Sequence, residues 1–344
     1  MKAIVKYDRV DKAVEIRDVP EPVIGPDQVL LEVKAVGVCG SDVHMWREHQ
    51  SWAIKLPLVL GHEFAGVIAE VGENVTGWQV GDRVACETAA RSMRYVQLLR
   101  ERQLQPLPPP PGLRRAHRRQ HDPVRGGAAG HPAPRLDHVP LEYAALTEPV
   151  CVAMNALAEK TTIKPGDMTV IQDRGLSASW RCRWPRFRAQ DRSSSPVRTW
   201  TSTGWRSRRS WARDYVVNIQ RQDPLDLVRS LGDGFGADLV VDCTGVSAAL
   251  QQAMALVRPN GRITKIGWGP QPLNFSLDPL VQKAVTLQGS FSHTFGTWER
   301  VIRLMGSGQL NLDPVIGGVY AIDEWETAFA KMEEGENVKS VLKF

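Results

Sequence analysis

Two short motifs near the start of the chain contain the residue types that bind a transition metal. Gly37-Val-Cys-Gly-Ser-Asp-Val-His44 is followed by Gly61-His-Glu-Phe-Ala-Gly66. A thiolate, an imidazole and a carboxylate together bind zinc and leave a fourth coordination position open. An ion with an open position acts as a Lewis acid on an alcohol oxygen. The Ser41 hydroxyl and the His44 imidazole are of the types that pass the alcohol proton on to water.

Taken one at a time, these residues are more often structural than functional, because histidine and cysteine are common in protein interiors. The ordered pair of motifs is more specific. Together with Val71-Gly-Glu-Asn-Val75 and Val80-Gly-Asp-Arg-Val84, it closely resembles the zinc-dependent medium-chain alcohol and polyol dehydrogenases. That family includes alcohol, sorbitol (L-iditol) and threonine dehydrogenases.

The resemblance implies two groups of site residues. The ligands of the catalytic zinc ion are Cys39, His62 and Glu63. The proton relay consists of Ser41 and His44, and Glu63 is counted with them among the catalytic residues.

A second glutamate is implied by the segment Leu146-Thr-Glu-Pro-Val150. It resembles the place where sorbitol- and threonine-type members have an acid near the metal. Glu148 would then be a zinc ligand or a hydrogen-bond partner of the metal-bound water. The alternative is an acid at a helix N-terminus, which the helix dipole favours.

The order of expected elements predicts two domains. Up to Thr88 the pattern is β-rich, with strands over 29–36 and 64–71. From Asp214 onward strands and helices alternate, which predicts a doubly wound parallel sheet. The expected strands are 169–171, 215–218, 237–243 and 261–267, and the expected helices are 223–231 and 248–257.

The chain is therefore expected to be an α/β protein. A catalytic zinc domain is expected over residues 1–153 and 291–344, and a dinucleotide-binding domain over 154–290. The resemblance implies a GroES-like fold for the first and a Rossmann fold for the second.

Strand ends in the second domain supply candidates for binding NAD, because open parallel sheets bind ligands at the carboxyl ends of their strands. By resemblance to the family, the cofactor-binding candidates are Thr244, Gly245, Ile266, Gly267, Trp268, Ser290 and Phe291. Lys339 is a further candidate, for a cofactor phosphate, and a solvated surface lysine is the alternative for it.

Two arginine-rich segments interrupt these patterns. Residues 91–138 contain ten Arg, no Lys and three acids, and residues 173–213 contain eleven Arg, no Lys and two acids. Their charges of +7 and +9 exceed the net charge of +5, so the rest of the chain is acidic. A nucleic-acid-binding protein would present such residues on a recognisable binding fold, and we find none. A structureless loop of such length is rare inside an α/β unit.

The genetic code offers an explanation for both segments. When the codons from Met93 are read in a shifted frame, they permit cysteines at positions 93, 96, 99 and 107, which is the spacing of the family's structural zinc lobe. From Gln172 the other shifted frame permits a Gly-x-Gly-x-x-Gly turn, which binds a pyrophosphate at a helix N-terminus. We therefore interpret both segments as frame-shifted readings, from a sequencing error or a real mutation.

Function and context follow from these features. We expect hydride transfer from a secondary alcohol, such as that of sorbitol or L-iditol, to NAD. The alternatives are a threonine or simple alcohol dehydrogenase, or an inactive zinc-binding remnant if the printed frame is literal. Five cysteines without paired spacing, and no long apolar run, indicate a cytoplasmic protein with neither disulfides nor a membrane span. We expect no nucleic-acid partner, and a homodimer or homotetramer.

Overall fold

The structure is a computed structural model that describes residues 1–87, 124–125, 136, 138–164, 166–172, 215, 217–219, 221–267, 269 and 272–344. The chain divides into two compact units. Unit 1 consists of Met1–Cys151, Thr294–Glu334 and Lys339–Phe344, and unit 2 of Val152–His293 and Gly335–Val338. Most of segment 91–138 and all of segment 173–213 lie outside the described residues. No helix in the described ranges is long and apolar enough to cross a bilayer.

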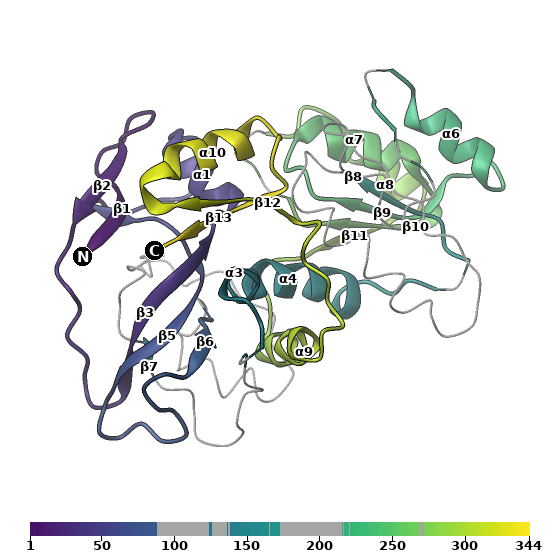
Figure 1. Cartoon of the computed structure of the whole chain (residues 1–344). Helices are drawn as coiled ribbons and strands as arrows, with labels where there is room; N and C mark the ends of the chain where they lie inside the picture. Colours follow the sequence, from purple (N-terminus) through teal and green to yellow (C-terminus); the bar gives the residue numbers. More distant parts are fainter. Residues whose placement is uncertain are drawn as a thin grey trace. The chain divides into compact units, whose positions relative to one another are not determined.

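Unit 1 is built on two β-sheets (Figure 1). The six-stranded sheet has the order β12-β13-β3-β5-β6, with β7 paired to β3. Its strands are β3 (Gln28–Gly37), β5 (Glu63–Val71), β6 (Arg83–Ala85), β7 (Val124–Arg125), β12 (Ile316–Ala321) and β13 (Lys339–Lys343). The three-stranded sheet, in the order β2-β1-β4, contains β1 (Lys2–Lys6), β2 (Val14–Asp18) and β4 (Leu58–Val59). The strands expected over 29–36 and 64–71 are confirmed.

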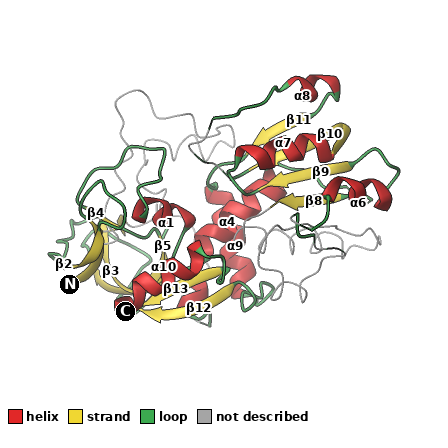
Figure 2. Ribbon diagram, turned by 90° about the horizontal axis from the view of Figure 1, so that it is seen from above, coloured by secondary structure: helices red, strands yellow, loops and turns green. Residues whose placement is uncertain are grey.

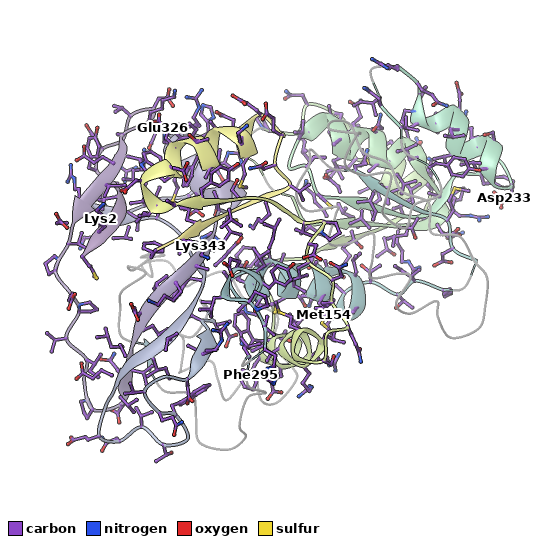
Figure 3. The ribbon with its side chains drawn as sticks, in the orientation of Figure 1. Lys2, Met154, Asp233, Phe295, Glu326 and Lys343 are labelled. Atoms are coloured by element: carbon purple, nitrogen blue, oxygen red, sulfur yellow. The ribbon has the colours of Figure 1, made fainter. Side chains whose placement is uncertain are left out.

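Unit 1 also contains helices. They are α1 (Gly40–Trp46), α3 (Leu141–Ala144), α9 (Phe295–Gly306) and α10 (Trp325–Glu333), and α4 (Thr147–Met154) begins in this unit. A 3₁₀ turn, Ile322–Glu324, precedes α10. Near the C-terminus, Lys343 on β13 lies with its Nζ 2.7 Å from Glu142 Oε1 of α3 (Figure 3).

An aromatic cluster attaches α1 to α10. Trp46 packs edge-on against Trp325 and Phe329, with ring centroids 6.2 and 5.9 Å away. Trp325 and Phe329 pack on each other at 5.3 Å. All three rings are buried, and edge-to-face contacts of this kind add to the free energy of burial. The helix that carries Ser41 and His44 is thereby fixed by residues from the far end of the sequence.

Unit 2 contains a parallel four-stranded sheet in the order β11-β10-β9-β8 (Figure 2). Its strands are β8 (Thr169–Gln172), β9 (Ala237–Asp242), β10 (Val257–Lys265) and β11 (Thr286–Gly289). Its helices are α6 (Pro224–Leu231), α7 (Ser247–Leu256) and α8 (Asp278–Gln282), and a π-helix spans Asn155–Glu159. The alternation expected from the sequence is confirmed, and the sheets of both units, with their helices, confirm the α/β fold class.

The strand expected over 215–218 is wrong for the residues that the structure describes. Tyr215, Val217 and Asn218 are not in a strand. The chain turns here, because the carbonyl of Asn218 accepts the N–H groups of Arg221 and Gln222 at 2.9 and 3.1 Å. Val217 is nevertheless buried in the core with β9 and α7, which explains its apolar character.

Beyond this turn, α6 begins with residues that favour a helix start. Asp223 caps α6 by accepting the N–H of Leu225 at 2.8 Å, and Pro224 occupies the first helical position. After α6, Asp233 forms an ion pair with Arg258 at 2.7 Å (Figure 3). The helix therefore begins where its sequence signals predict.

Candidate active site

Three predicted metal ligands of unit 1 lie together. One ligand atom each from Cys39, His62 and Glu63 lies within 4.8 Å of the others. The β3–β5 register brings them together, because Gly37 at the end of β3 is opposite Glu63 at the start of β5. Ligand atoms around a tetrahedral zinc ion are about 3.5 Å apart, so only a small adjustment is needed. One thiolate, one imidazole and one carboxylate fit zinc.

Gly37 is required by the packing of the Glu63 carboxylate. A β-carbon at position 37 would lie 2.4 Å from Glu63 Oε2 and 3.1 Å from a methyl group of Leu146. No side chain fits at such distances, so the glycine of the first motif is explained by close contact. Substitution there would displace the carboxylate from the cluster.

A fourth residue, Asp42, holds the cluster from behind. It is 1% exposed, and its Oδ2 accepts the N–H of Cys39 at 2.9 Å. Its Oδ1 accepts the N–H of Gly61 at 3.1 Å and lies 3.5 Å from His62 Nδ1. A carboxylate behind a histidine fixes the ring orientation and leaves the other nitrogen for a metal. Asp42 is thus placed to orient both Cys39 and His62.

Asp42 and His62 each shift the pKa of the other toward the charged form. Burial alone would raise the pKa of Asp42, but the adjacent His62 and the N–H groups of Cys39 and Gly61 bring it below its usual value. Burial would lower the pKa of His62, but Asp42 and Cys39 raise it well above its usual value. A bound cation would therefore take the place of a proton on His62.

Lys339 lies at this cluster. Its ammonium is 2.6 Å from Glu63 Oε1, and the residue is 5% exposed. Burial would lower the pKa of Lys339, but Glu63, Cys39 and Glu148 raise it. The alternative of a solvated surface lysine is wrong. The proposed contact of Lys339 with a cofactor phosphate stays a prediction.

The other candidates in unit 1 lie on helices around the cluster. Ser41 and His44 are half-buried and three residues apart on α1, which places them on one side of that helix. Glu148 is half-buried in the first turn of α4. Its charge contributes to the raised pKa of Lys339, although it is not one of the three clustered ligands. The relay and the second-glutamate role stay predictions.

The cofactor candidates of unit 2 follow neighbouring strands of the parallel sheet. Thr244 and Gly245 follow β9, Ile266 and Gly267 follow β10, and Ser290 and Phe291 follow β11. Trp268 lies outside the described residues. The Ser290 hydroxyl is buried and has no hydrogen-bond partner in the part of the chain that the structure describes. The candidates therefore share one sheet edge, and their contact with a cofactor stays a prediction.

Comparison with known proteins decides the family. An alcohol dehydrogenase GroES-like domain model matches residues 25–103, and a zinc-binding dehydrogenase model matches residues 209–307. A sorbitol dehydrogenase from Halalkalibacterium halodurans is 31% identical over 353 residues, covering 99% of each chain. The chain belongs to the zinc-dependent medium-chain dehydrogenases.

Other relatives of this medium-chain dehydrogenase differ in their named substrates. An L-threonine 3-dehydrogenase from Thermococcus kodakarensis is 32% identical over 373 residues, covering 99% of this chain and 97% of that one. A solved alcohol dehydrogenase from Escherichia coli CFT073, complexed with NADH, matches with a TM-score of 0.75 at 22% identity. That match covers 100% of this chain and 99% of the other, and it shows the fold. The expected zinc- and nicotinamide-dependent oxidoreductase is confirmed at the level of the family.

Asp42 is a residue of the dehydrogenase site that was not predicted from the sequence. Asp42 lies inside the first motif, three residues after Cys39, but a buried helix-capping acid has the same local pattern. A signal was present, because metal-bound histidines commonly have a carboxylate partner. The ion pair of Lys339 with Glu63 had no local signal, since the residues are 276 positions apart.

Removing the Asp42 carboxylate is expected to weaken zinc binding. Asp42→Ala should lower zinc affinity by about 10- to 100-fold, because Cys39 and His62 lose their common support. Asp42→Asn should lose less, since an amide oxygen still accepts N–H groups. Competition with a chelator, followed by elemental analysis, measures the affinity. The exposed Asp323→Ala is the control, and equal zinc retention in Asp42→Ala and the control would contradict the role.

Proposed function

We propose that this dehydrogenase oxidises the secondary alcohol of a polyol, such as sorbitol or L-iditol, with NAD. The observation that carries the proposal is the cluster of Cys39, His62 and Glu63 beside the buried Asp42. Similarity to a sorbitol dehydrogenase supports the polyol, while similarity to a threonine dehydrogenase keeps threonine or a simple alcohol as the alternative.

Each residue of unit 1 has a separate task in this proposal. Cys39, His62 and Glu63 hold zinc, and Glu148 is a further ligand or a hydrogen-bond partner of its water. Zinc bound by these residues would supply a Lewis acid for the alcohol oxygen, and NAD would supply the acceptor for the hydride of the carbinol carbon. Asp42 keeps the His62 ring in position for its metal-binding nitrogen.

The proton of the alcohol leaves through α1. The Ser41 oxygen would accept this proton while the Ser41 hydroxyl gives its own proton to the His44 imidazole, one helical turn later, and His44 would release a proton to water. The aromatic packing of Trp46 holds this helix in place. A relay needs groups within hydrogen-bond reach, so the rigidity of α1 matters for its rate.

Unit 2 is the proposed nicotinamide domain. Its candidate contacts are Thr244, Gly245, Ile266, Gly267, Trp268, Ser290 and Phe291. Lys339 is a further candidate for cofactor binding. We propose residues 1–153 and 291–344 as the catalytic zinc domain and 154–290 as the dinucleotide-binding domain, which the division into two compact units supports. A cytoplasmic location is proposed from the odd number of cysteines.

The relay predicts a selective loss of rate. His44→Ala should lower kcat for polyol oxidation by about a hundredfold, because a positioned proton acceptor is lost. Zinc content should stay unchanged, and added imidazole buffer should restore part of the rate. His49→Ala is the control, since His49 is exposed and follows α1.

The substrate class is tested by initial rates of the zinc-loaded protein with sorbitol, L-iditol, threonine and ethanol. Inactivity on all four would contradict the proposed function.

The proposed homodimer or homotetramer finds support at one edge of unit 2. Among the described strands, β11 pairs only with β10. Leu273, Leu277 and Leu287 near this edge are about two-fifths exposed, and Val281 on α8 is 82% exposed. Exposed apolar side chains beside an open strand edge favour association with another chain.

A charged side chain at this edge is expected to separate the subunits. Val281→Asp should reduce the mass measured by light scattering to that of one chain, because burying an unpaired carboxylate in an interface is costly. Val23→Asp is the control, since Val23 is 91% exposed in unit 1. An unchanged mass for Val281→Asp would exclude this edge as the interface.

We further propose that residues 91–138 and 173–213 are frame-shifted readings of family sequence. The two family models leave residues 104–208 uncovered, although the sorbitol dehydrogenase relative extends over 99% of the chain. Resequencing the gene should find an insertion or deletion near both ends of each segment, with cysteine codons in the first and a glycine-rich turn in the second. A confirmed printed frame would instead favour the inactive zinc-binding remnant.

A further inference from the structure

A buried ion pair joins two neighbouring strand ends of unit 2. Asp242 is the last residue of β9, and Lys265, the last residue of β10, is its partner in the strand register. Lys265 Nζ lies 2.8 Å from Asp242 Oδ2, with side-chain exposures of 27% and 0%. A carboxylate withdrawn from water needs a cation or several hydrogen bonds to remain charged. Lys265 supplies that cation.

The other carboxylate oxygen fixes the turn after β9. Asp242 Oδ1 accepts both the N–H of Thr244 at 2.9 Å and its hydroxyl at 2.8 Å. The Thr244 oxygen in turn accepts the N–H of Val246 at 3.0 Å, at the start of α7. Two successive hydrogen bonds therefore lead from Asp242, through the Thr244 hydroxyl, to the N-cap of α7.

The turns after β9 and β10 are also in direct contact. The carbonyl of Asp242 accepts the N–H groups of Ile266 and Gly267 at 2.8 and 3.1 Å. A β-carbon on Gly267 would lie 2.3 Å from the Gly245 nitrogen, and Gly245 itself has a φ of +72°. No side chain separates the two turns, so displacement of one moves the other.

We propose that Lys265 is a positioning residue for dinucleotide binding, acting through Asp242 on the Thr244–Gly245 and Ile266–Gly267 turns. The inference rests on the proposed function, which assigns these turns to NAD. Lys265 itself needs no contact with the cofactor. Its ammonium is the ion-pair partner of the buried carboxylate, and that carboxylate holds the N–H and hydroxyl of Thr244 in the turn that would face the dinucleotide.

The test compares three forms of the zinc-loaded, full-length protein. NADH binding is measured by the change in its fluorescence, without turnover. Lys265→Met should raise the dissociation constant of NADH by about tenfold, which corresponds to the loss of one charge-assisted hydrogen bond. Lys265→Arg should stay within about twofold of the unchanged protein, because it restores the cation. Zinc content should be the same in all three.

A second lysine of the same unit provides the control. Lys283 donates to the carbonyls of Met254, Ala255 and Val257 at 2.8, 3.1 and 2.8 Å, at the end of α7. Lys283→Met should lower the thermal unfolding midpoint and leave the NADH dissociation constant unchanged. This variant separates a general loss of stability from a loss of positioning.

A double variant covers the case in which Lys265→Met does not fold. Asp242→Asn with Lys265→Met removes the unpaired buried charge but keeps an oxygen that accepts the Thr244 N–H. The double variant should fold. Where Lys265→Met also folds, the double variant should bind NADH more tightly than Lys265→Met. Where Lys265→Met is unfolded, the double variant should bind NADH with at most a moderate loss of affinity relative to the unchanged protein. A folded double variant with no NADH binding would mean that Lys265 contacts the cofactor directly, contrary to the inference.

Two outcomes separate the inference from the proposed function. NADH binding by folded Lys265→Met that equals that of the unchanged protein overturns the inference alone. Absence of NADH binding by the unchanged, zinc-loaded protein contradicts the proposed function itself and removes the basis of the inference with it.

Discussion

The buried carboxylate of Asp42 is the interaction on which the metal site depends. The groups that it joins come from two loops, one after β3 and one before β5. An acid that is 1% exposed is stable only when its oxygens have partners, so the loops must lie where their N–H groups reach it. The same contacts that satisfy Asp42 therefore bring Cys39 and His62 to one point. The need of the buried Asp42 carboxylate for hydrogen-bond partners thus determines both the fold of the two loops and the position of the metal ligands.

Unit 2 also has a buried carboxylate that needs hydrogen-bond partners, at the end of β9. Asp242 is as buried as Asp42, and its carboxylate accepts the N–H and the hydroxyl of Thr244 in the turn next to it. The two acids differ in their charge partners. Asp42 lies beside an imidazole, which has a nitrogen that can bind a metal, whereas Asp242 lies beside an ammonium, which only donates hydrogen bonds. The first acid thus supports a metal ligand, while the second supports a turn of the backbone.

Much of this architecture was predictable from the sequence, for physical reasons that differ from element to element. Strands β3 and β5 were predicted because their apolar pattern is local, and α6 because Asp223 and Pro224 mark its start. The metal ligands were predicted from two motifs and their resemblance to the zinc-dependent medium-chain dehydrogenases. The burial of Lys339 against Glu63 was not predicted, because the two residues meet only through the pairing of β13 with β3. The strand over 215–218 failed because buried valines also occur in turns that pack on a core.

The discontinuity of unit 1 has a consequence for the protein during its synthesis. The loops that contain Cys39 and His62 leave the ribosome early, but β13, which pairs with β3, leaves it after all of unit 2. Trp325 and Phe329, which hold α1, are also made late. Contacts between residues so far apart in sequence form slowly, after more local ones. The nascent chain therefore exposes the Cys39 thiol to oxidants and competing metals until translation is almost complete, and selective zinc loading falls to the released, folded protein.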